Sequence, residues 1–384
     1  MPAPVTFRPL VSRRTLLLGS AAALACGRPK PSGFSGYCFV ANQGGRSVGV
    51  VDLTRFRLRK QIPLDAAPAA VVAHPARPVV FVLAPDAGTV YEIDAASLSV
   101  SRRARAGTRA VAMQLAPRND ALWVLYREPA ALVEIPLDSL RPARRIRLPA
   151  PADHFDLGRE NQAAIASLAS HSIVVASLAS AAIERTIAAG VEPSLVRFQW
   201  DGKQVLVGSR PERCLTIFDS ASGKTVVRLP LPIAPRNFCF NADGGQLFVT
   251  GEGADAVVIV FPYSTEIDQT ILAGRAPGAM AVTGTAPFYL LVANPDSNGI
   301  TVMDVDTRTL VALVQVGQEP RQILLTPDNQ WALVLNETSG DVAVIRIFSL
   351  AVTPNGAPRR FKSAPLFTLI PVGEKPVSAA ILAV

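Results

Sequence analysis

The chain has 384 residues, of which 49% are hydrophobic and 18% are charged, and its formal net charge is +8. This composition excludes a disordered chain and provides enough apolar side chains for a large core. The 32 prolines and 26 glycines predict many turns and few long helices. No apolar run reaches the roughly 18 to 20 residues that a membrane-spanning helix needs.

The first 25 residues have the pattern of an export signal. Three arginines and no acidic residue precede a short apolar stretch, residues 16–25. Arg13 and Arg14, within the sequence SRRTLL, resemble the twin-arginine export motif, and an ordinary secretion signal is the alternative. We therefore expect an exported protein, in the periplasm or at the cell surface.

Cys26 directly follows a small-residue cleavage pattern, Ala23-Leu24-Ala25. This segment resembles a bacterial lipobox, in which the cysteine becomes the mature N-terminus and carries lipid, although Ala23 stands where leucine is usual. The resemblance implies lipidation of Cys26 and a membrane anchor, with simple cleavage as the alternative. Residues 26–35 are rich in Gly, Pro and Ser and predict a flexible tether.

The mature chain would be mildly basic. Loss of residues 1–25 removes three arginines and no acids, so the net charge falls from +8 to +5. No dense stripe of Lys and Arg follows, so we expect no nucleic-acid partner. Cys38, Cys214 and Cys239 stand in apolar contexts and predict small buried side chains, with one disulfide plus a free thiol as the alternative.

An internal repeat determines the fold class. One register aligns eight anchor positions: Pro68, Ala110, Ala152, Pro193, Pro235, Pro277, Pro320 and Pro376. The spacings between them are 42, 42, 41, 42, 42, 43 and 56 residues. Each unit reads as four short strands, with a tight turn such as Asp201-Gly202 between the first and second. Four-stranded units repeated at this period predict an all-β fold, a β-propeller.

The blade number follows from the same register. The repeat begins at Gly36 with a second strand that lacks its first, and it ends at Val384 with a lone first strand. We therefore predict a single domain over residues 36–384 with eight blades, in which the C-terminal strand pairs with the N-terminal strands and closes the ring. Seven blades are the alternative. The last unit carries extra residues at about 350–367, including Arg359, Arg360 and Lys362, which predict a solvated loop or a partner-binding arm.

Several strands carry a recognisable core. Phe39-Val40-Ala41-Asn42, Leu291-Val292-Ala293-Asn294 and Phe248-Val249-Thr250 resemble the Tyr-Val-Thr-Asn core of the YVTN-family β-propeller repeats. The resemblance extends over the whole region after the tether and is weakest in the fourth unit. It implies a propeller and leaves the activity open, because such repeats occur in surface proteins, in lactonases and in redox proteins that house haem d1 or a quinone.

The candidate site lies at the anchors. In a propeller the first strand lines the central channel, so the turn before it surrounds one mouth of that channel. The charged residues next to the anchors are Arg109, Asp153, Glu192, Arg236, Glu319, Arg321 and Lys375. Two interpretations stay open: salt bridges between neighbouring blades, or a polar funnel that binds a small anionic or zwitterionic ligand.

Histidines are scarce, and no catalytic constellation is present. Among His74, His154 and His171, we expect only His154 to lie near the channel, two residues after an anchor, where it is a further ligand-binding candidate. We predict no catalytic residue, no metal site and no cofactor. The sequence thus favours a monomeric, non-enzymatic module that binds an unknown protein or a small polar ligand. The alternative is a lactonase-like hydrolase or a cofactor-dependent oxidoreductase.

Overall fold

The computed structural model describes residues 33–350 and 364–384. The export motif with Arg13 and Arg14, the lipidation site Cys26 and most of the predicted tether lie outside the described residues, as do Arg359, Arg360 and Lys362. In the described part, no helix is long and apolar enough to cross a membrane.

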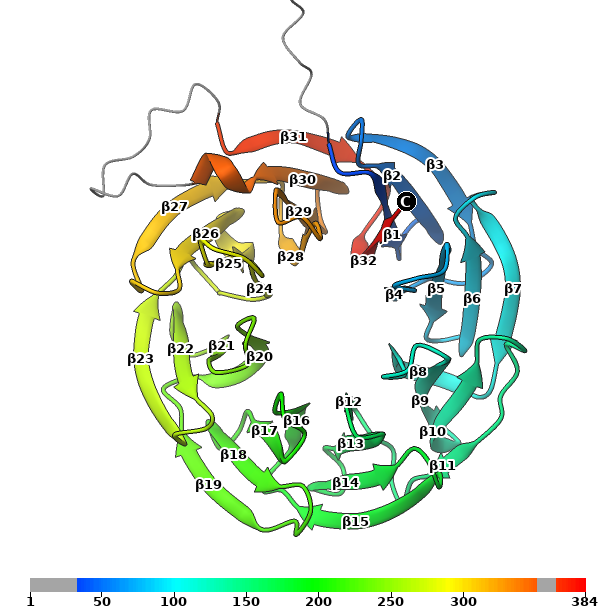
Figure 1. Cartoon of the computed structure of the whole chain (residues 1–384), viewed down its shortest axis with the longest axis vertical. Helices are drawn as coiled ribbons and strands as arrows, with labels where there is room; N and C mark the ends of the chain where they lie inside the picture. Colours follow the sequence, from blue (N-terminus) through cyan, green and yellow to red (C-terminus); the bar gives the residue numbers. More distant parts are fainter. Residues whose placement is uncertain (1–32, 351–363) are drawn as a thin grey trace, which may run out of the picture. The chain divides into compact units, whose positions relative to one another are not determined.

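Eight four-stranded antiparallel sheets form in the described part of the chain, and they are arranged as a ring (Figure 1). The predicted eight-bladed β-propeller is confirmed, and the alternative of seven blades is wrong. Blade 1 combines β32 (Pro376–Ala383) with β1 (Gly36–Asn42), β2 (Ser47–Asp52) and β3 (Arg57–Pro63). The other seven blades each use four consecutive strands.

The next three blades follow in chain order. Blade 2 contains β4 (Ala70–Ala73), β5 (Val79–Ala84), β6 (Thr89–Asp94) and β7 (Ser99–Arg105). Blade 3 contains β8 (Thr108–Leu115), β9 (Ala121–Glu128), β10 (Ala130–Pro136) and β11 (Arg145–Arg147). Blade 4 contains β12 (His154–Gly158), β13 (Gln162–Ser167), β14 (Ser172–Ser177) and β15 (Ala182–Ala188).

The last four blades complete the ring. Blade 5 contains β16 (Pro193–Phe198), β17 (Gln204–Ser209), β18 (Cys214–Asp219) and β19 (Thr225–Pro230). Blade 6 contains β20 (Ala234–Phe240), β21 (Leu247–Glu252), β22 (Ala256–Phe261) and β23 (Glu266–Leu272). Blade 7 contains β24 (Met280–Val282), β25 (Tyr289–Asn294), β26 (Gly299–Asp304) and β27 (Leu310–Gln315), with the 3-10 turn η1 (Pro295–Ser297). Blade 8 contains β28 (Pro320–Leu325), β29 (Trp331–Asn336), β30 (Asp341–Arg346) and β31 (Leu366–Pro371), with η2 (Ile347–Leu350).

The two ends of the repeat region close the ring, as predicted. β32 pairs antiparallel with β1, in a register that places Leu382 opposite Tyr37 and Ala380 opposite Phe39. Leu382 packs in the core between blades 1 and 2, while Ala379 and Ile381 contact the core between blades 8 and 1. The closing strand therefore supplies apolar side chains to both neighbouring interfaces.

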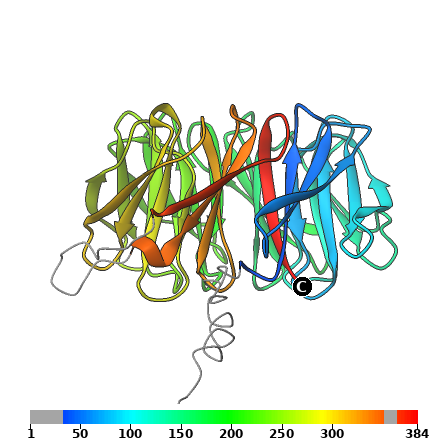
Figure 2. The same ribbon diagram turned by 90° about the horizontal axis from the view of Figure 1, so that it is seen from above.

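The middle strands of each blade form the core because both of their faces are covered by neighbouring blades. Five consecutive residues of β5, Val80–Ala84, are buried, and all six residues of β29 are buried. Cys38 and Cys214 are buried and Cys239 is half-buried, and none of these three forms a disulfide. The innermost strands begin at one edge of the ring, which we call the mouth (Figures 1 and 2). The hairpins between second and third strands reach the same edge, because neighbouring strands are antiparallel.

Candidate functional site

The turn before five of the eight inner strands places one residue at the mouth in an uncommon backbone conformation. The anchor residues themselves are buried. Immediately before five of them the chain adopts a left-handed φ, between 47° and 57°, at Arg109, Glu192, Ala276, Glu319 and Lys375. Non-glycine residues rarely adopt this conformation. The recurring turn geometry therefore fixes one position at the mouth in each of five blades, and four of these five positions carry a charge.

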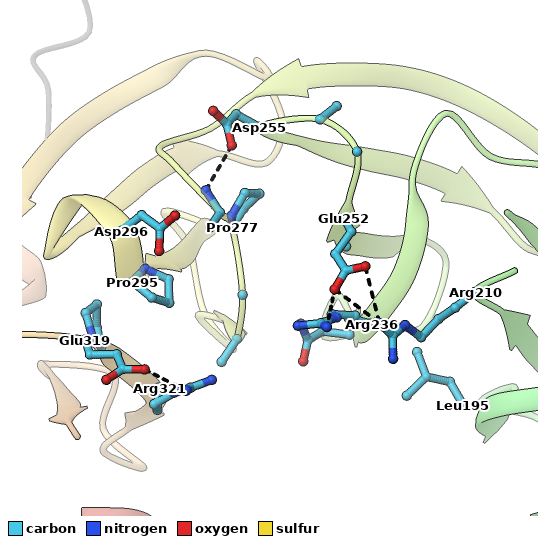
Figure 3. Close-up of a pocket in the computed structure, with 18 of the residues that line it drawn as sticks. Leu195, Arg210, Arg236, Glu252, Asp255, Pro277, Pro295, Asp296, Glu319 and Arg321 are labelled. Atoms are coloured by element: carbon cyan, nitrogen blue, oxygen red, sulfur yellow. Dashed lines mark hydrogen bonds and ion pairs between the residues drawn. The ribbon is translucent and has the colours of Figure 1, made fainter. Parts of the chain in front are cut away.

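A large hollow occupies one side of the mouth, across blades 5 to 8 (Figure 3). Its volume is about 850 Å³, within the range typical of small-molecule sites. Much of its wall is glycine, alanine and proline, which leave the space open. The charged residues that line it are Arg210, Arg236, Glu252, Asp255, Asp296, Glu319 and Arg321.

At one end of the hollow, two arginines share a single carboxylate. Arg210 of blade 5 donates through Nη2 to both oxygens of Glu252, at 3.1 and 3.2 Å. Arg236 of blade 6 forms a close ion pair with the same carboxylate (Figure 3). Two positive charges against one negative charge leave this end with a positive surplus.

The other end of the hollow has more acidic than basic groups. Arg321 pairs with Glu319 at 2.6 Å and with Glu337 at 2.7 Å. A hydrogen bond from the Thr338 hydroxyl and the positive charge of Arg321 lower the pKa of Glu319, so this side chain is ionised at neutral pH. Asp296, on η1, is exposed and has no hydrogen-bond or ion-pair partner within residues 33–350 and 364–384.

On blades 3 and 4, the predicted site residues form closed ion pairs. Arg109 contacts Glu128 at 2.8 Å. Asp153 contacts Arg127 of the preceding blade at 2.5 Å and also accepts a hydrogen bond from the backbone N–H of Leu168. Neither Arg109 nor Asp153 lines the 850 Å³ hollow.

The remaining predicted residues lie elsewhere around the mouth. Glu192 is exposed, and its backbone N–H donates to Nδ1 of His171. Lys375 lies 3.9 Å from Glu337 and lines a second, shallower hollow between blades 8 and 1, with a volume of about 550 Å³. Of the eight candidates, the structure thus brings together Arg236, Glu319 and Arg321 around the large hollow.

His154 does not line this hollow. It lies at the start of β12, and its Nδ1 atom is shut off from solvent without a hydrogen-bond partner in the described part of the chain. Burial, assisted by the positive charge of Arg197, lowers the pKa of His154 to about 4. The imidazole is therefore neutral at pH 7. His74 is buried and accepts hydrogen bonds from two backbone N–H groups, so it has a structural role.

The charged mouth residues that were not anticipated include a set at one common position: Arg127, Arg210, Glu252 and Glu337. These four lie at or just after the end of a second strand, and each follows an anchor by 17 residues. The repeat register therefore contained the signal, since a fixed offset from the anchor places one residue per blade at the same edge. The repeat register could not identify their ion-pair partners, because three of the pairs join neighbouring blades: Arg127–Asp153, Arg210–Glu252 and Glu337–Lys375.

Within the described residues, no group of three or more His, Cys, Asp or Glu side chains is placed to hold a metal ion. The polar atoms at the mouth are instead guanidinium and carboxylate groups on a ring of β-sheets. Fold and mouth together define the chain as a β-propeller protein.

Comparison with known proteins agrees with this class. No family model matches the chain. It is similar to the seven-bladed β-propeller protein Rv1057 from Mycobacterium tuberculosis, with 29% identity over 150 residues, which is 38% of each chain. The match thus spans well under half of that relative's length, and the present chain has eight blades rather than seven.

Two solved structures share the architecture at low sequence identity. Dihydro-heme d1 dehydrogenase NirN, in complex with DHE, superposes with a TM-score of 0.73 at 17% identity, covering 90% of this chain and 75% of that one. Hydrazine synthase from Kuenenia stuttgartiensis gives a TM-score of 0.59 at 19% identity, covering 74% and 96%. At these identities the likeness concerns the fold alone.

Proposed function

We propose that this propeller is a binding module that takes a small polar ligand into the hollow at its mouth. The observation that carries the proposal is the 850 Å³ hollow on blades 5 to 8, lined by seven charged side chains. On blades 3 and 4 the corresponding charged residues are paired one to one and do not line this hollow. The YVTN-like strand cores are compatible with a binding module, because similar repeats occur in surface proteins as well as in lactonases and redox proteins.

The enzyme alternative rests on the fold. NirN and hydrazine synthase are enzymes by name, and both resemble this chain only in architecture. One fold hosts many activities, so this likeness does not transfer a reaction. An absorption spectrum and a metal analysis of the purified chain separate the two ideas: a visible chromophore or a stoichiometric metal favours an oxidoreductase.

A matched pair of glycine substitutions tests binding at the mouth. Gly278 lines the hollow, and a Cβ atom there would approach no atom closer than 3.7 Å. Gly278→Trp should therefore fill the hollow without disturbing the sheet. Gly284 lies at the other end of β24, and a Cβ atom there would be 3.6 Å from its nearest neighbour. Gly284→Trp is the control at the opposite edge.

The readout is the set of small molecules that each protein retains. Parent and variants are incubated with the protein-free fraction of a cell extract, washed and denatured, and the released compounds are identified by mass spectrometry. We expect a compound that is released from the parent and from Gly284→Trp but not from Gly278→Trp. Equal release from all three proteins, or none from any, would contradict binding at the mouth.

We further propose that the protein is exported and held at a membrane through lipid on Cys26. The cleavage pattern before Cys26 and the basic, acid-free start of the chain support this. The test is Cys26→Ala followed by fractionation of membranes and soluble protein. The parent should be found with membranes and the variant in the soluble fraction. Equal solubility of both would overturn the anchor.

A further inference from the structure

The charges of the mouth hollow are separated in a way that indicates the class of ligand. We propose, resting on the mouth-binding function above, that the site takes a small zwitterion with its anionic group at Arg210 and Arg236 and its cationic group at Asp296 and Glu319. Figure 3 shows the two arginines with Glu252 on one side of the hollow, and Asp296 and Glu319 on the other. Pro277 lies between the two groups (Figure 3).

The arginine end is suited to an anion. A guanidinium has five N–H donors, and the contacts of Arg210 and Arg236 with Glu252 use only Nη2 of each. Both side chains are about half exposed, at 42% and 50%. Donors therefore stay available to a ligand carboxylate, which two arginines can bind through paired hydrogen bonds. The shared Glu252 holds both guanidinium groups in place and leaves one positive charge uncompensated.

The acidic end is suited to a cation. Asp296 is exposed, and no described side chain forms an ion pair with it. Glu319 is ionised, and its neighbour Arg321 is shared with Glu337. An ammonium group placed between Asp296 and Glu319 would meet two carboxylates, with Arg321 and the more distant Lys375 as the competing cations. A purely anionic ligand would be repelled at this end, whereas a zwitterion satisfies both.

The wall between the ends favours a slender ligand backbone. It includes Gly251, Gly253 and Gly278, so side chains do not fill the space between the charged groups. A short peptide with free termini has the required chemistry, with its carboxylate at one end and its ammonium at the other. The other interpretation is that these charges serve only each other, as on blades 3 and 4.

The experiment measures binding of oligoalanines of two to five residues to the full chain by calorimetry. Each length is tested with free termini, with an amidated C-terminus and with an acetylated N-terminus. We expect one length to bind best, and each blocked form of it to bind at least tenfold more weakly. Equal binding of free and blocked forms, or no binding of any length at millimolar concentration, would overturn the zwitterion.

Substitutions assign the two ends. Arg236→Gln should weaken binding of the free peptide by about the same factor as amidation does, and it should leave binding of the amidated peptide unchanged. Asp296→Asn should weaken binding of the free peptide by about the same factor as acetylation and should leave binding of the acetylated peptide unchanged. Arg109→Gln, on the closed side of the mouth, is the control and should change none of these affinities. A variant that weakens every form equally would contradict the assigned orientation.

The two proposals fail in distinguishable ways. If Gly278→Trp abolishes retention of an extract compound while no oligoalanine binds, the mouth binds a ligand of another class and only the zwitterion is wrong. If Gly278→Trp changes nothing and no oligoalanine binds, mouth binding is wrong as well. Peptide binding that survives Gly278→Trp would place the peptide elsewhere and would also reject the proposed site.

Discussion

The two sides of the mouth use the same backbone positions and the same residue types, yet the 850 Å³ hollow lies on only one of them. On blades 3 and 4, Arg109 pairs with Glu128 and Arg127 pairs with Asp153, so charges match one to one. On blades 5 to 8 the groups are unequal: two arginines share Glu252, whereas Arg321 and Lys375 face Glu319, Glu337 and Asp296, the last of which forms no ion pair with a described residue. The charges on blades 3 and 4 are therefore balanced in pairs, whereas those on blades 5 to 8 leave surplus charge around the 850 Å³ hollow.

This difference separates what the repeat requires from what a site requires. Charge at the mouth is a consequence of the repeat, since the second hairpins and most of the turns before inner strands contain exposed residues. A charge surplus of opposite sign at the two ends of one hollow is not needed to join blades. The charge surplus is therefore the better indicator of function.

The largest effect is expected from opening the ring. Deletion of residues 378–384 removes most of β32, and with it the partner strand of β1 and the buried side chains of Ala379 and Leu382. Loss of these side chains, of half-buried Ile381 and of the ladder hydrogen bonds should lower the free energy of unfolding by about 5 kcal/mol or more. This approaches the whole stability of an ordinary domain.

Thermal unfolding of the truncated and full chains checks this prediction. We expect the truncated chain to aggregate or to lose its cooperative transition, because β1 would become an open sheet edge. A cooperative transition within a few degrees of the parent would show that the ring is held closed without β32. The structure of both sides of the mouth would then not depend on the pairing of β1 with β32.

The architecture was predictable because it depends on short-range patterns repeated many times. The 42-residue spacing gave eight blades, and the incomplete units at Gly36 and Val384 gave the closure. Even the fourth unit, whose sequence resembles the repeat core least, forms β12 to β15 as a regular four-stranded sheet. Blades 3 and 5 cover the two faces of this sheet, so packing between blades compensates for the weak sequence pattern of the fourth unit.

The site was predictable only in part, because the repeat register determines where a residue lies, whereas the packing of blades determines which residue it contacts. The register placed Arg236, Glu319 and Arg321 at the mouth, and they line the hollow. It could not show that Arg210 reaches Glu252 of the next blade, since that contact depends on the distance between blades. Nor could it show the hollow, which exists because small residues such as Gly251 and Gly278 stand between longer ones.

A smaller effect is expected from His154, behind the closed side of the mouth. Its pKa is about 4 in the folded chain, against 6.5 for an unburied histidine, so the unfolded state binds more protons between these values. Folding stability should therefore fall as pH is lowered from 6.5 to 4, by about 3 kcal/mol. Asp156, whose pKa burial raises above its ordinary value, acts in the opposite direction.

The control for this prediction is His154→Leu. The variant retains His74, His171 and Asp156, so only the contribution of His154 is removed. Urea unfolding at several pH values should give a shallower decline for the variant than for the parent between pH 6.5 and 4. Parallel curves for the two proteins would show that His154 is solvated and takes up its proton without cost.

The ion pairs themselves should differ in their contribution to stability on the two sides. Asp153 is 20% exposed and accepts hydrogen bonds from Arg127 and from the backbone of Leu168, so Asp153→Ala should cost about 1 to 2 kcal/mol. Glu319, on the open side, is 36% exposed, so Glu319→Ala should cost less than about 1 kcal/mol. Urea unfolding measures both. An equal or larger cost for Glu319→Ala would mean that the open side is also structural.

The smallest effect is expected where the hollow is filled. Gly278 has no left-handed φ, and its surroundings leave room for a side chain, so Gly278→Trp should change the free energy of unfolding by no more than about 1 kcal/mol. Gly251, in the same wall, provides the contrast: a Cβ atom there would lie 1.9 Å from the carbonyl oxygen of Ala234, so Gly251→Ala should destabilise the chain clearly. Urea unfolding of both variants beside Gly284→Trp checks this. If Gly278→Trp proved as costly as Gly251→Ala, the space on the open side would be part of the packed ring, and the difference between the two sides of the mouth would disappear.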